Sequence, residues 1–131
     1  MVHQREASFT TRYLILVTFD PGGWESASPE ERQGYGDSHQ AFDCFIAERG
    51  RRVAWATLAG ADTATALRHV DGEMVVSSGP FVESVEEVGG YYDVELPDLD
   101  SAIHATSLLP SAYVVEIRPV MMLGLPMRRV G

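Results

Sequence analysis

Residues 78–105 read SGPFVESVEEVGGYYDVELPDLDSAIHA, and this stretch is the most informative about the fold. A Gly-Pro turn opens it, and the alternating apolar residues of 91–96 predict a strand. The sequence Pro97-Asp98-Leu99-Asp100 predicts a helix start, with Asp98 as the cap and early carboxylates at the positive helix end. Residues 113–118 then predict a last strand. Few residues remain between these elements, so the order of the second half is closely defined.

The first half of the chain predicts one long helix. Ser28-Pro29-Glu30-Glu31 combines a serine cap, proline at the first helical position and glutamate three residues after the cap. Gly34 and Gly36 weaken the following turn, so we expect the helix to be interrupted there and to start again with Asp37 as a second cap. Gly50 is expected to end it.

Strand patterns surround this helix. The run YLILVTF at 13–19 is short and apolar throughout, which is typical of a strand buried on both faces. A second strand is expected at 53–58. Two further segments, 64–70 and 73–77, flank Asp71-Gly72, a strong hairpin signal.

The resulting order is strand, helix, strand, hairpin, strand, helix, strand. It predicts an α+β fold of the ferredoxin-like split βαβ type with an inserted β-hairpin. The helices of that fold cover one sheet face, yet Leu14, Ile15, Leu16 and Val17 place apolar residues on both faces of the first strand. We therefore expect a homodimer in which a second copy covers the open face.

Length and charge restrict the class of protein. The 131 residues suit one domain, expected at 12–121, with a loose N-terminus at 1–11 and an apolar tail at 122–131. A net charge of −9 argues against nucleic-acid binding, which needs a basic surface. All ten basic residues are arginine, so neither a Schiff-base lysine nor a phosphate-loop lysine is present.

Membrane segments, cysteine pairs and metal-ligand spacings are missing from the sequence, and each absence leads to an expectation. No run of 18 apolar residues and no signal-peptide core is present, so we expect a cytoplasmic protein without a membrane segment. Cys44 is the only cysteine, and we expect a buried, inert thiol. No pair of histidines has the spacing of metal ligands, and we expect neither a metal site nor a cofactor.

Several of these motifs together resemble a known family. They are Gly79-Pro80-Phe81, Gly89-Gly90-Tyr91, Asp98-Leu99-Asp100 and the sequence EIRPV at 116–120. In that order they resemble the YCII-related proteins, and most of all the subgroup named for its D-G-P-F motif, over about residues 12–121. The resemblance implies a dimeric α/β-barrel fold. Most of the family has no established activity, a few relatives act on ring compounds such as chlorinated hydroquinones, and some members accompany alternative sigma factors.

The chain departs from the motif at two positions. Ser78 replaces the leading Asp, and Val85 replaces the Lys usual between the two Glu residues of the motif, Glu83 and Glu86. Ser78 is nevertheless a candidate catalytic residue, because a Gly-Pro turn directs the preceding side chain. A serine can donate and accept hydrogen bonds but cannot carry the charge of an aspartate. Alternatively, the turn only sets the angle between the hairpin and the next strand.

His39 is the main candidate for acid–base chemistry. It lies three residues before Phe42, on or beside the inward face of the helix. The resemblance implies a role for it beside an acidic residue in a pocket, and an imidazole there is a plausible general base. The alternative is a partly exposed histidine without a role.

Four further residues are candidate ligand contacts. Phe81 and Tyr91 would supply aromatic surface for a flat ring, although aromatic residues on strands are more often core. His69, on the first hairpin strand, points either into a cavity between sheets or toward solvent. Arg118 would clamp a carboxylate or, as we favour, pair with Glu116 or with a dimer partner.

Together these observations predict a small-molecule-binding homodimer. The expected ligand is an aromatic or carbonyl-bearing metabolite in a pocket between the sheet and the first long helix, with acid–base chemistry by His39. The alternative is a non-catalytic dimer that senses a ligand or binds a partner linked to transcription regulation. Ser78 in place of the motif Asp favours this alternative.

Overall fold

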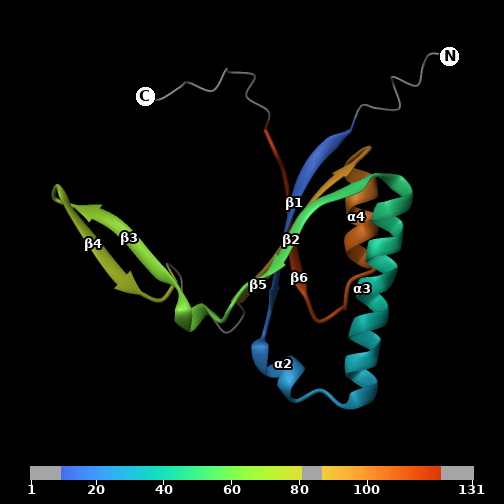
Figure 1. Cartoon of the computed structure of the whole chain (residues 1–131), viewed down its shortest axis with the longest axis horizontal. Helices are drawn as coiled ribbons and strands as arrows, with labels where there is room; N and C mark the ends of the chain where they lie inside the picture. Colours follow the sequence, from blue (N-terminus) through green and yellow to red (C-terminus); the bar gives the residue numbers. More distant parts are fainter. Residues whose placement is uncertain (1–9, 81–86, 122–131) are drawn as a thin grey trace.

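The computed structural model describes residues 10–80 and 87–121 (Figure 1). Its elements follow in the order β1 (Thr11–Phe19), α2 (Pro21–Glu25), α3 (Pro29–Arg49), β2 (Arg51–Thr57), the 3-10 helix η1 (Ala61–Thr63), β3 (Thr65–Val70), β4 (Glu73–Ser78), β5 (Glu87–Leu96), α4 (Leu99–Ser107) and β6 (Val114–Pro119). The predicted order of strands and long helices is confirmed. The short helix α2 was not predicted.

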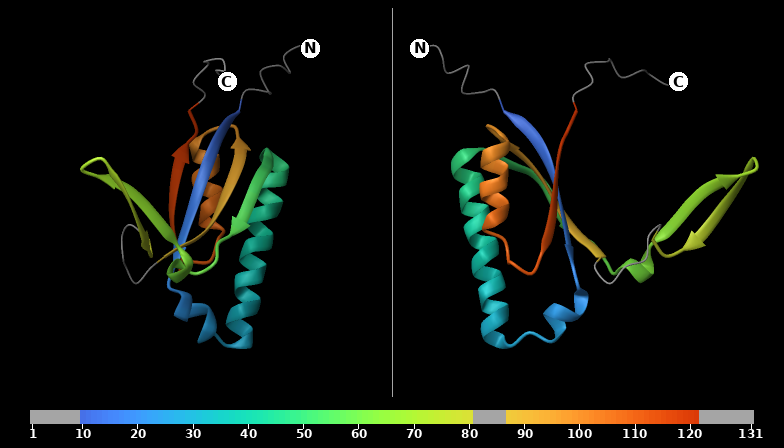
Figure 2. Two further views of the ribbon diagram at one scale, coloured as in Figure 1. Left: turned by 60° about the vertical axis from the view of Figure 1, so that its left-hand side comes forward. Right: turned by 180° about the vertical axis from the view of Figure 1, so that it is seen from behind.

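Four strands form an antiparallel sheet in the order β2-β5-β1-β6. β1 lies in the middle, where Ile15 faces Tyr92 of β5 on one side and Ile117 of β6 on the other. Both long helices, α3 and α4, cover the same face of this sheet (Figures 1 and 2). This arrangement agrees with the predicted α+β fold of the ferredoxin-like type.

The core lies between this covered face and the two helices. β1 buries every second residue, as a strand with one covered face must. Phe42 and Ile46, four residues apart on α3, meet that face and are almost completely buried. The buried cluster consists of Tyr13, Ile15, Val17, Phe42, Ile46, Val94, Leu96, Ala102, Ala105 and Leu109. Each large apolar side chain among these contributes about 1.5–3 kcal/mol to stability.

α3 starts as predicted but is not interrupted. The Ser28 hydroxyl accepts a hydrogen bond from the Glu31 N–H at 3.1 Å, and the Glu31 carboxylate accepts one from the Ser28 N–H at 2.7 Å. The helix then runs through Gly34 and Gly36 to Arg49, so the expected second start at Asp37 is wrong. Glycine lowers helix propensity by only about 1 kcal/mol per residue, which the cap and the packing of the helix on the sheet outweigh.

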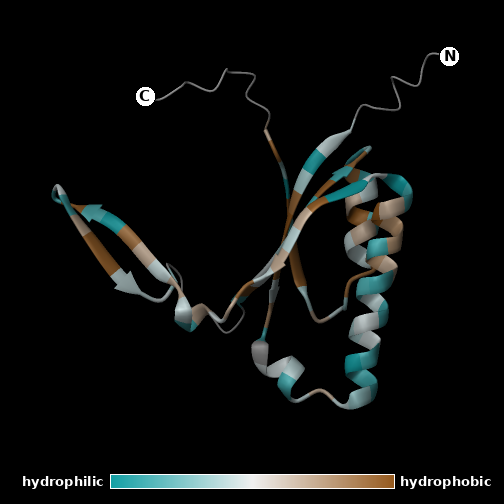
Figure 3. Ribbon diagram, viewed as in Figure 1, coloured by the Kyte–Doolittle hydropathy of each residue, from teal (hydrophilic) through white to brown (hydrophobic). Residues whose placement is uncertain are grey.

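A hairpin arm, formed by β3 and β4, stands apart from the main sheet. Asp71 and Gly72 both have positive φ angles, 51° and 82°, as the predicted two-residue turn requires. The arm projects on the side of the sheet opposite to the helices (Figures 1 and 2). Hydrophobic residues cover much of it (Figure 3), and its exposed apolar side chains are Leu67, Val70, Met74, Val75 and Val76.

The uncovered face of the main sheet is mixed in character. Leu14 and Leu16 of β1 lie on it, as predicted, because they alternate with the buried residues of that strand. Ion pairs cross the same face, and these are Arg12–Asp93, Arg51–Glu95 and Arg118–Glu116. The face is therefore less apolar than the sequence of β1 alone indicated.

The exposure of Cys44 differs from the sequence prediction. Its thiol is exposed on α3, although we expected it to be buried. Phe42 and Ile46 occupy the inward side of this part of the helix, and a residue midway between them in sequence is turned away from the sheet. Within 10–80 and 87–121, no helix is long and apolar enough to cross a membrane.

Candidate functional site

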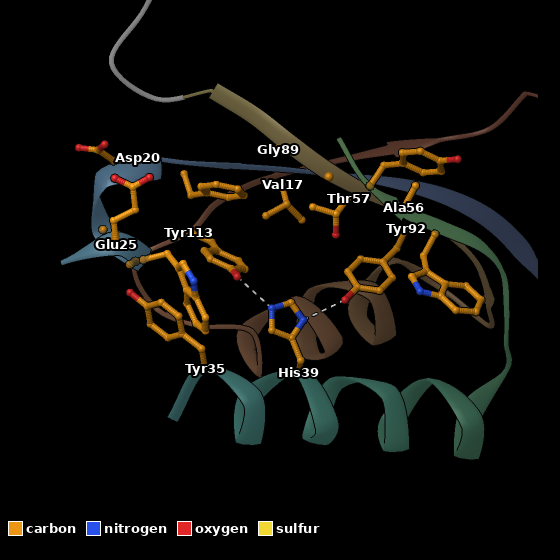
Figure 4. A pocket seen from close by; sticks show the side chains of 17 residues that line it. Val17, Asp20, Glu25, Tyr35, His39, Ala56, Thr57, Gly89, Tyr92 and Tyr113 are labelled. Carbon is orange, nitrogen blue, oxygen red and sulfur yellow. Dashed lines mark hydrogen bonds between the residues drawn. The ribbon is translucent and has the colours of Figure 1, made fainter. Parts of the chain in front are cut away.

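A cavity of about 490 Å³ lies between one end of the sheet, α2 and the first half of α3 (Figure 4). Residues from β1, β2, β5 and the segment before β6 complete its lining. Aromatic rings dominate its walls and are contributed by Phe19, Trp24, Tyr35, Trp55, Tyr92 and Tyr113. A cavity with these walls suits a small, flat, mostly apolar ligand.

The rings on the α2 side form a continuous wall. Trp24 stacks on Tyr35 with the ring centroids 5.6 Å apart, and Tyr35 lies 6.2 Å from Tyr113. Phe19 packs against Tyr113 at 5.6 Å. These spacings fall in the range of favourable aromatic pairs, so the rings hold one another in place before any ligand enters.

Trp55 forms the opposite side and is held from outside the cavity. The Arg52 guanidinium lies 3.5 Å from the centre of the Trp55 ring, a cation–π contact. The same guanidinium donates to the Asp43 carboxylate at 3.0 Å. Trp55 remains 55% exposed, so its ring presents a free apolar surface at the cavity.

His39 lies at the base of the cavity, between two tyrosines (Figure 4). Its Nδ1 is 2.9 Å from the Tyr92 hydroxyl, and its Nε2 is 2.9 Å from the Tyr113 hydroxyl. Tyr92 is fixed in turn by packing on Phe42, with ring centroids 4.4 Å apart. The three polar side chains are thus positioned by α3, β5 and the residue just before β6.

Burial keeps this polar group neutral. Desolvation lowers the pKa of His39, and the nearby charge of Asp43 opposes that shift only in part. Desolvation, with the Asp43 charge, raises the pKa of Tyr92 to about 12. The pKa of Tyr113 is also raised, mainly by burial. Near neutral pH the two phenols are therefore protonated and the imidazole is uncharged.

The acidic partner that the resemblance implied for His39 is absent from its hydrogen bonds. Both ring nitrogens face tyrosine hydroxyls, and Asp43, one turn further along α3, is bonded to Arg52 instead. The charged residues of the lining are Asp20 and Glu25, at the α2 end. Their charges favour a neutral or cationic ligand over an anionic one.

Packing beside the cavity explains why position 89 is a glycine. A Cβ at this position would overlap the ring of Phe19. Glycine therefore allows β5 to approach an aromatic side chain of the cavity wall. Gly89 and Gly90 both lie within β5 and are buried.

The predicted site residues fall into two groups. His39 and Tyr91 both line the cavity. His69 and Ser78 lie on the arm, at exposed positions outside this lining. Arg118 also lies outside it and pairs with Glu116 at 3.2 Å, which confirms the pairing that we favoured. Phe81 lies outside the described residues, as do Glu83 and Glu86.

Two aromatic residues of the wall, Trp24 and Tyr35, lie on helices and not on the strands where aromatic contacts were expected. Tyr35 lies four residues before His39 on the same helix, and this spacing could have identified it as a neighbour. Trp24 lies in the unpredicted helix α2, where no periodic pattern marked it. Among residues 10–80 and 87–121, no cluster of three or more His, Cys, Asp or Glu side chains could hold a metal ion.

Comparison with known proteins identifies the family. The model of the YCII-related domain matches residues 11–123. The chain belongs to the YCII-related family. It is 30% identical, over 112 residues, to an uncharacterised protein of Rhizobium meliloti (strain 1021), and the match spans 82% of this chain and 90% of that protein. The relative's description therefore names no substrate.

Proposed function

We propose that this YCII-related protein binds a small, neutral, aromatic or carbonyl-bearing metabolite in the cavity between the sheet and α3. The observation that carries the proposal is the cavity of about 490 Å³, walled mostly by aromatic rings, with the polar groups of His39, Tyr92 and Tyr113 at its base. Such a space accommodates a flat ring, and the Trp55 and Tyr113 rings on opposite sides provide surfaces for stacking.

The proposal extends to acid–base chemistry at the base of the cavity. His39 is half-buried and its pKa lies below the ordinary value, so the neutral form that can accept a proton predominates at neutral pH. It lies beside hydroxyl groups that a ligand can reach. This combination supports an enzyme of the type that transfers protons on its substrate.

Blocking the cavity tests ligand binding directly. Thr57 points into it (Figure 4) and lies at the exposed edge strand β2, so Thr57→Phe fills space without cutting into the core. Thr65→Phe is the matched control, because Thr65 is an exposed strand threonine on the arm. A panel of neutral ring ketones and phenols is screened by thermal shift.

Ligand at 100 times its dissociation constant stabilises a protein by about 2.7 kcal/mol. We expect a compound of the panel to raise the unfolding temperature of the wild type and of Thr65→Phe, but not that of Thr57→Phe. Equal stabilisation of all three proteins would place binding elsewhere, and no stabilisation of any of them would reject the proposed ligand class.

The finer assignment to the DGPF-motif subgroup is also a proposal. It is supported by Gly79-Pro80-Phe81 in the expected order with the later motifs. Ser78, where the motif has Asp, ends β4 on the arm and faces Thr65 across the hairpin. This position favours a structural part for Ser78 over direct contact with a ligand in the cavity.

A second candidate function is that of a partner-binding homodimer, and the arm favours it. An isolated two-stranded hairpin is marginally stable in water. Leu67, Met74 and Val76 share one face of the arm, and each is about half exposed. The arm and the uncovered sheet face lie on the same side of the molecule (Figure 2). A second copy related by a two-fold axis would cover both at once.

Introducing positive charges on the apolar face of the arm tests this dimer. Sedimentation velocity is compared for the wild type, Leu67→Arg with Val76→Arg, and Ser107→Arg on the helical side as control. The arm variant is expected to sediment as a monomer and the other two as dimers. A monomeric wild type would reject the homodimer, and ligand binding without turnover would favour the sensing role linked to transcription regulation.

A further inference from the structure

Both ring nitrogens of His39 are already engaged. Nδ1 bonds to the Tyr92 hydroxyl and Nε2 to the Tyr113 hydroxyl, each at 2.9 Å. A ligand cannot reach either nitrogen without displacing a tyrosine. The tyrosine oxygens, which lie on the two sides of the imidazole, are therefore the atoms that face a ligand at the base of the cavity (Figure 4).

A neutral imidazole gives this chain of hydrogen bonds a direction. One ring nitrogen carries a proton and donates, whereas the other accepts. One tyrosine therefore donates its hydroxyl proton to the ring and keeps a lone pair for the ligand. The other accepts from the ring N–H, and its own O–H remains free to donate. The two ends of the chain thus offer opposite hydrogen-bonding functions.

Burial supports this neutral state. Desolvation lowers the pKa of His39 and raises those of Tyr92 and Tyr113, so all three groups are uncharged near pH 7. Asp43, the charged residue one turn away on α3, is bonded to Arg52 and does not receive a hydrogen bond from the ring. Arg52 itself lies over the Trp55 ring.

We propose that Tyr92, His39 and Tyr113 form a proton relay that interconverts the keto and enol forms of a neutral ring compound bound in the cavity. This inference rests on the proposed function, because it requires that the cavity bind such a compound. The relay differs from the proposed function because the two tyrosines, and not the imidazole, touch the substrate.

The protons and electron pairs of this keto–enol step balance without any further reagent. A C–H bond next to the substrate carbonyl breaks, and its proton passes to the oxygen of one tyrosine while that hydroxyl gives its own proton to His39. The opposite ring nitrogen gives its proton to the second tyrosine, whose hydroxyl proton passes to the carbonyl oxygen. The C–H electron pair becomes the C=C bond, and the carbonyl π pair becomes the new O–H bond. His39 ends as its other tautomer, ready for the reverse direction.

The lining determines which substrates fit. One end of the relay accepts and the other donates, so a ligand that bears both a carbonyl oxygen and an acidic C–H or O–H is complementary. Asp20 and Glu25 repel an anion at the α2 end. The stacked walls favour a planar ring over an open chain. These features together select a neutral, enolisable ring ketone.

Deuterium exchange into 2-indanone, a flat neutral ketone with acidic hydrogens beside the carbonyl, tests the relay. Proton NMR in D₂O near neutral pH follows the loss of these hydrogens, and thermal shift with the same ketone follows binding. The proteins compared are the wild type, Tyr92→Phe, Tyr113→Phe and His39→Gln. Tyr13→Phe is the control, because Tyr13 is a buried tyrosine outside the cavity lining.

We expect the wild type and the control to accelerate exchange above the buffer rate. Each tyrosine variant should lose about 100-fold or more of this acceleration, as should His39→Gln, because general acid–base catalysis contributes about that much. Binding of 2-indanone should change little in the Tyr→Phe variants, which keep the ring that lines the cavity.

Other results separate the relay from the proposed function. If either tyrosine variant keeps the wild-type rate while His39→Gln loses it, His39 acts directly and the relay is wrong, while the proposed function stands. If 2-indanone stabilises the wild type but its exchange is not accelerated, the relay is overturned and ligand binding is retained. If it neither binds nor exchanges, both the relay and its substrate class are rejected.

Discussion

The cavity end of the molecule and the hairpin arm use similar residues in opposite ways. At the cavity, aromatic side chains pack against one another and on the core residue Phe42. On the arm, apolar side chains such as Met74 and Val76 remain more than half exposed. Apolar composition therefore does not decide burial, because a strand must also meet a second layer.

The same comparison divides the predicted site residues. His39 and Tyr91 line the cavity, whereas His69 and Ser78 lie on the arm. The arm residues therefore act through a surface other than the cavity. We propose that a second copy of the chain covers that surface.

The largest effect is expected for Phe42→Ala. Phe42 is completely buried and supports the Tyr92 ring, so its loss should lower the free energy of unfolding by about 3–5 kcal/mol. Val76→Ala on the arm should change it by no more than about 0.5 kcal/mol. Urea denaturation measures both. A large loss for Val76→Ala at low protein concentration would mean that the arm packs on its own chain.

A smaller effect is expected for Ser28→Ala. The change removes one half of the capping box of α3, the helix that carries Tyr35 and His39. It should lower the free energy of unfolding by about 1 kcal/mol. Ser111→Ala, at an exposed position, is the control. If the two variants unfolded at the same urea concentration, the cap would not stabilise the cavity end.

A local effect is expected for Gly72→Ala. Gly72 has a φ of 82°, and a left-handed conformation costs other residues about 1–2 kcal/mol. Because the arm forms a sheet of its own, backbone amides of β3 and β4 should exchange with deuterium faster while those of β1 and β5 keep their protection. Gly34→Ala, in α3 with free space around its Cβ, should instead stabilise the helix. Faster exchange throughout the sheet would contradict this separation.

The smallest effect concerns pH. Burial lowers the pKa of His39 in the folded protein, so below about pH 6.5 the unfolded chain binds a proton that the folded one does not. Stability should therefore fall as the pH decreases through the window between the ordinary and the lowered pKa. Urea midpoints between pH 8 and pH 5 measure this slope, and His39→Gln should flatten it. An unchanged slope in the variant would assign the pH dependence to other groups.

Local signals predicted the fold well where the chemistry of a few neighbouring residues decides it. The Ser28–Glu31 box, the Asp98 cap and the Asp71-Gly72 turn are all present, because each depends on contacts within four residues. The predicted interruption at Gly34 and Gly36 failed because helix propensity is weak compared with packing. The short helix α2 was missed, although Asp20 caps it and Pro21 lies in its first turn, which are local signals of a helix start.

The site was predicted in part for the same reason. His39 could be chosen from its helical spacing to Phe42, but its hydrogen-bonding partners could not. Tyr92 is 53 residues away and Tyr113 is 74 residues away in sequence. Only the pairing of β5 and β6 with the two edges of β1 places these hydroxyls on the two sides of one imidazole.

The amino-acid sequence was enough to predict the order of elements, the caps and turns, and membership of the YCII-related family. Those features depend on short-range contacts and on motifs that are read directly from the chain. The tertiary structure alone decided which aromatic residues enclose the cavity, which groups bond to His39, and that the arm stands clear of the main sheet. The physical reason is that burial and hydrogen-bond partners are properties of packed layers, and a strand carries no local record of which face will be covered.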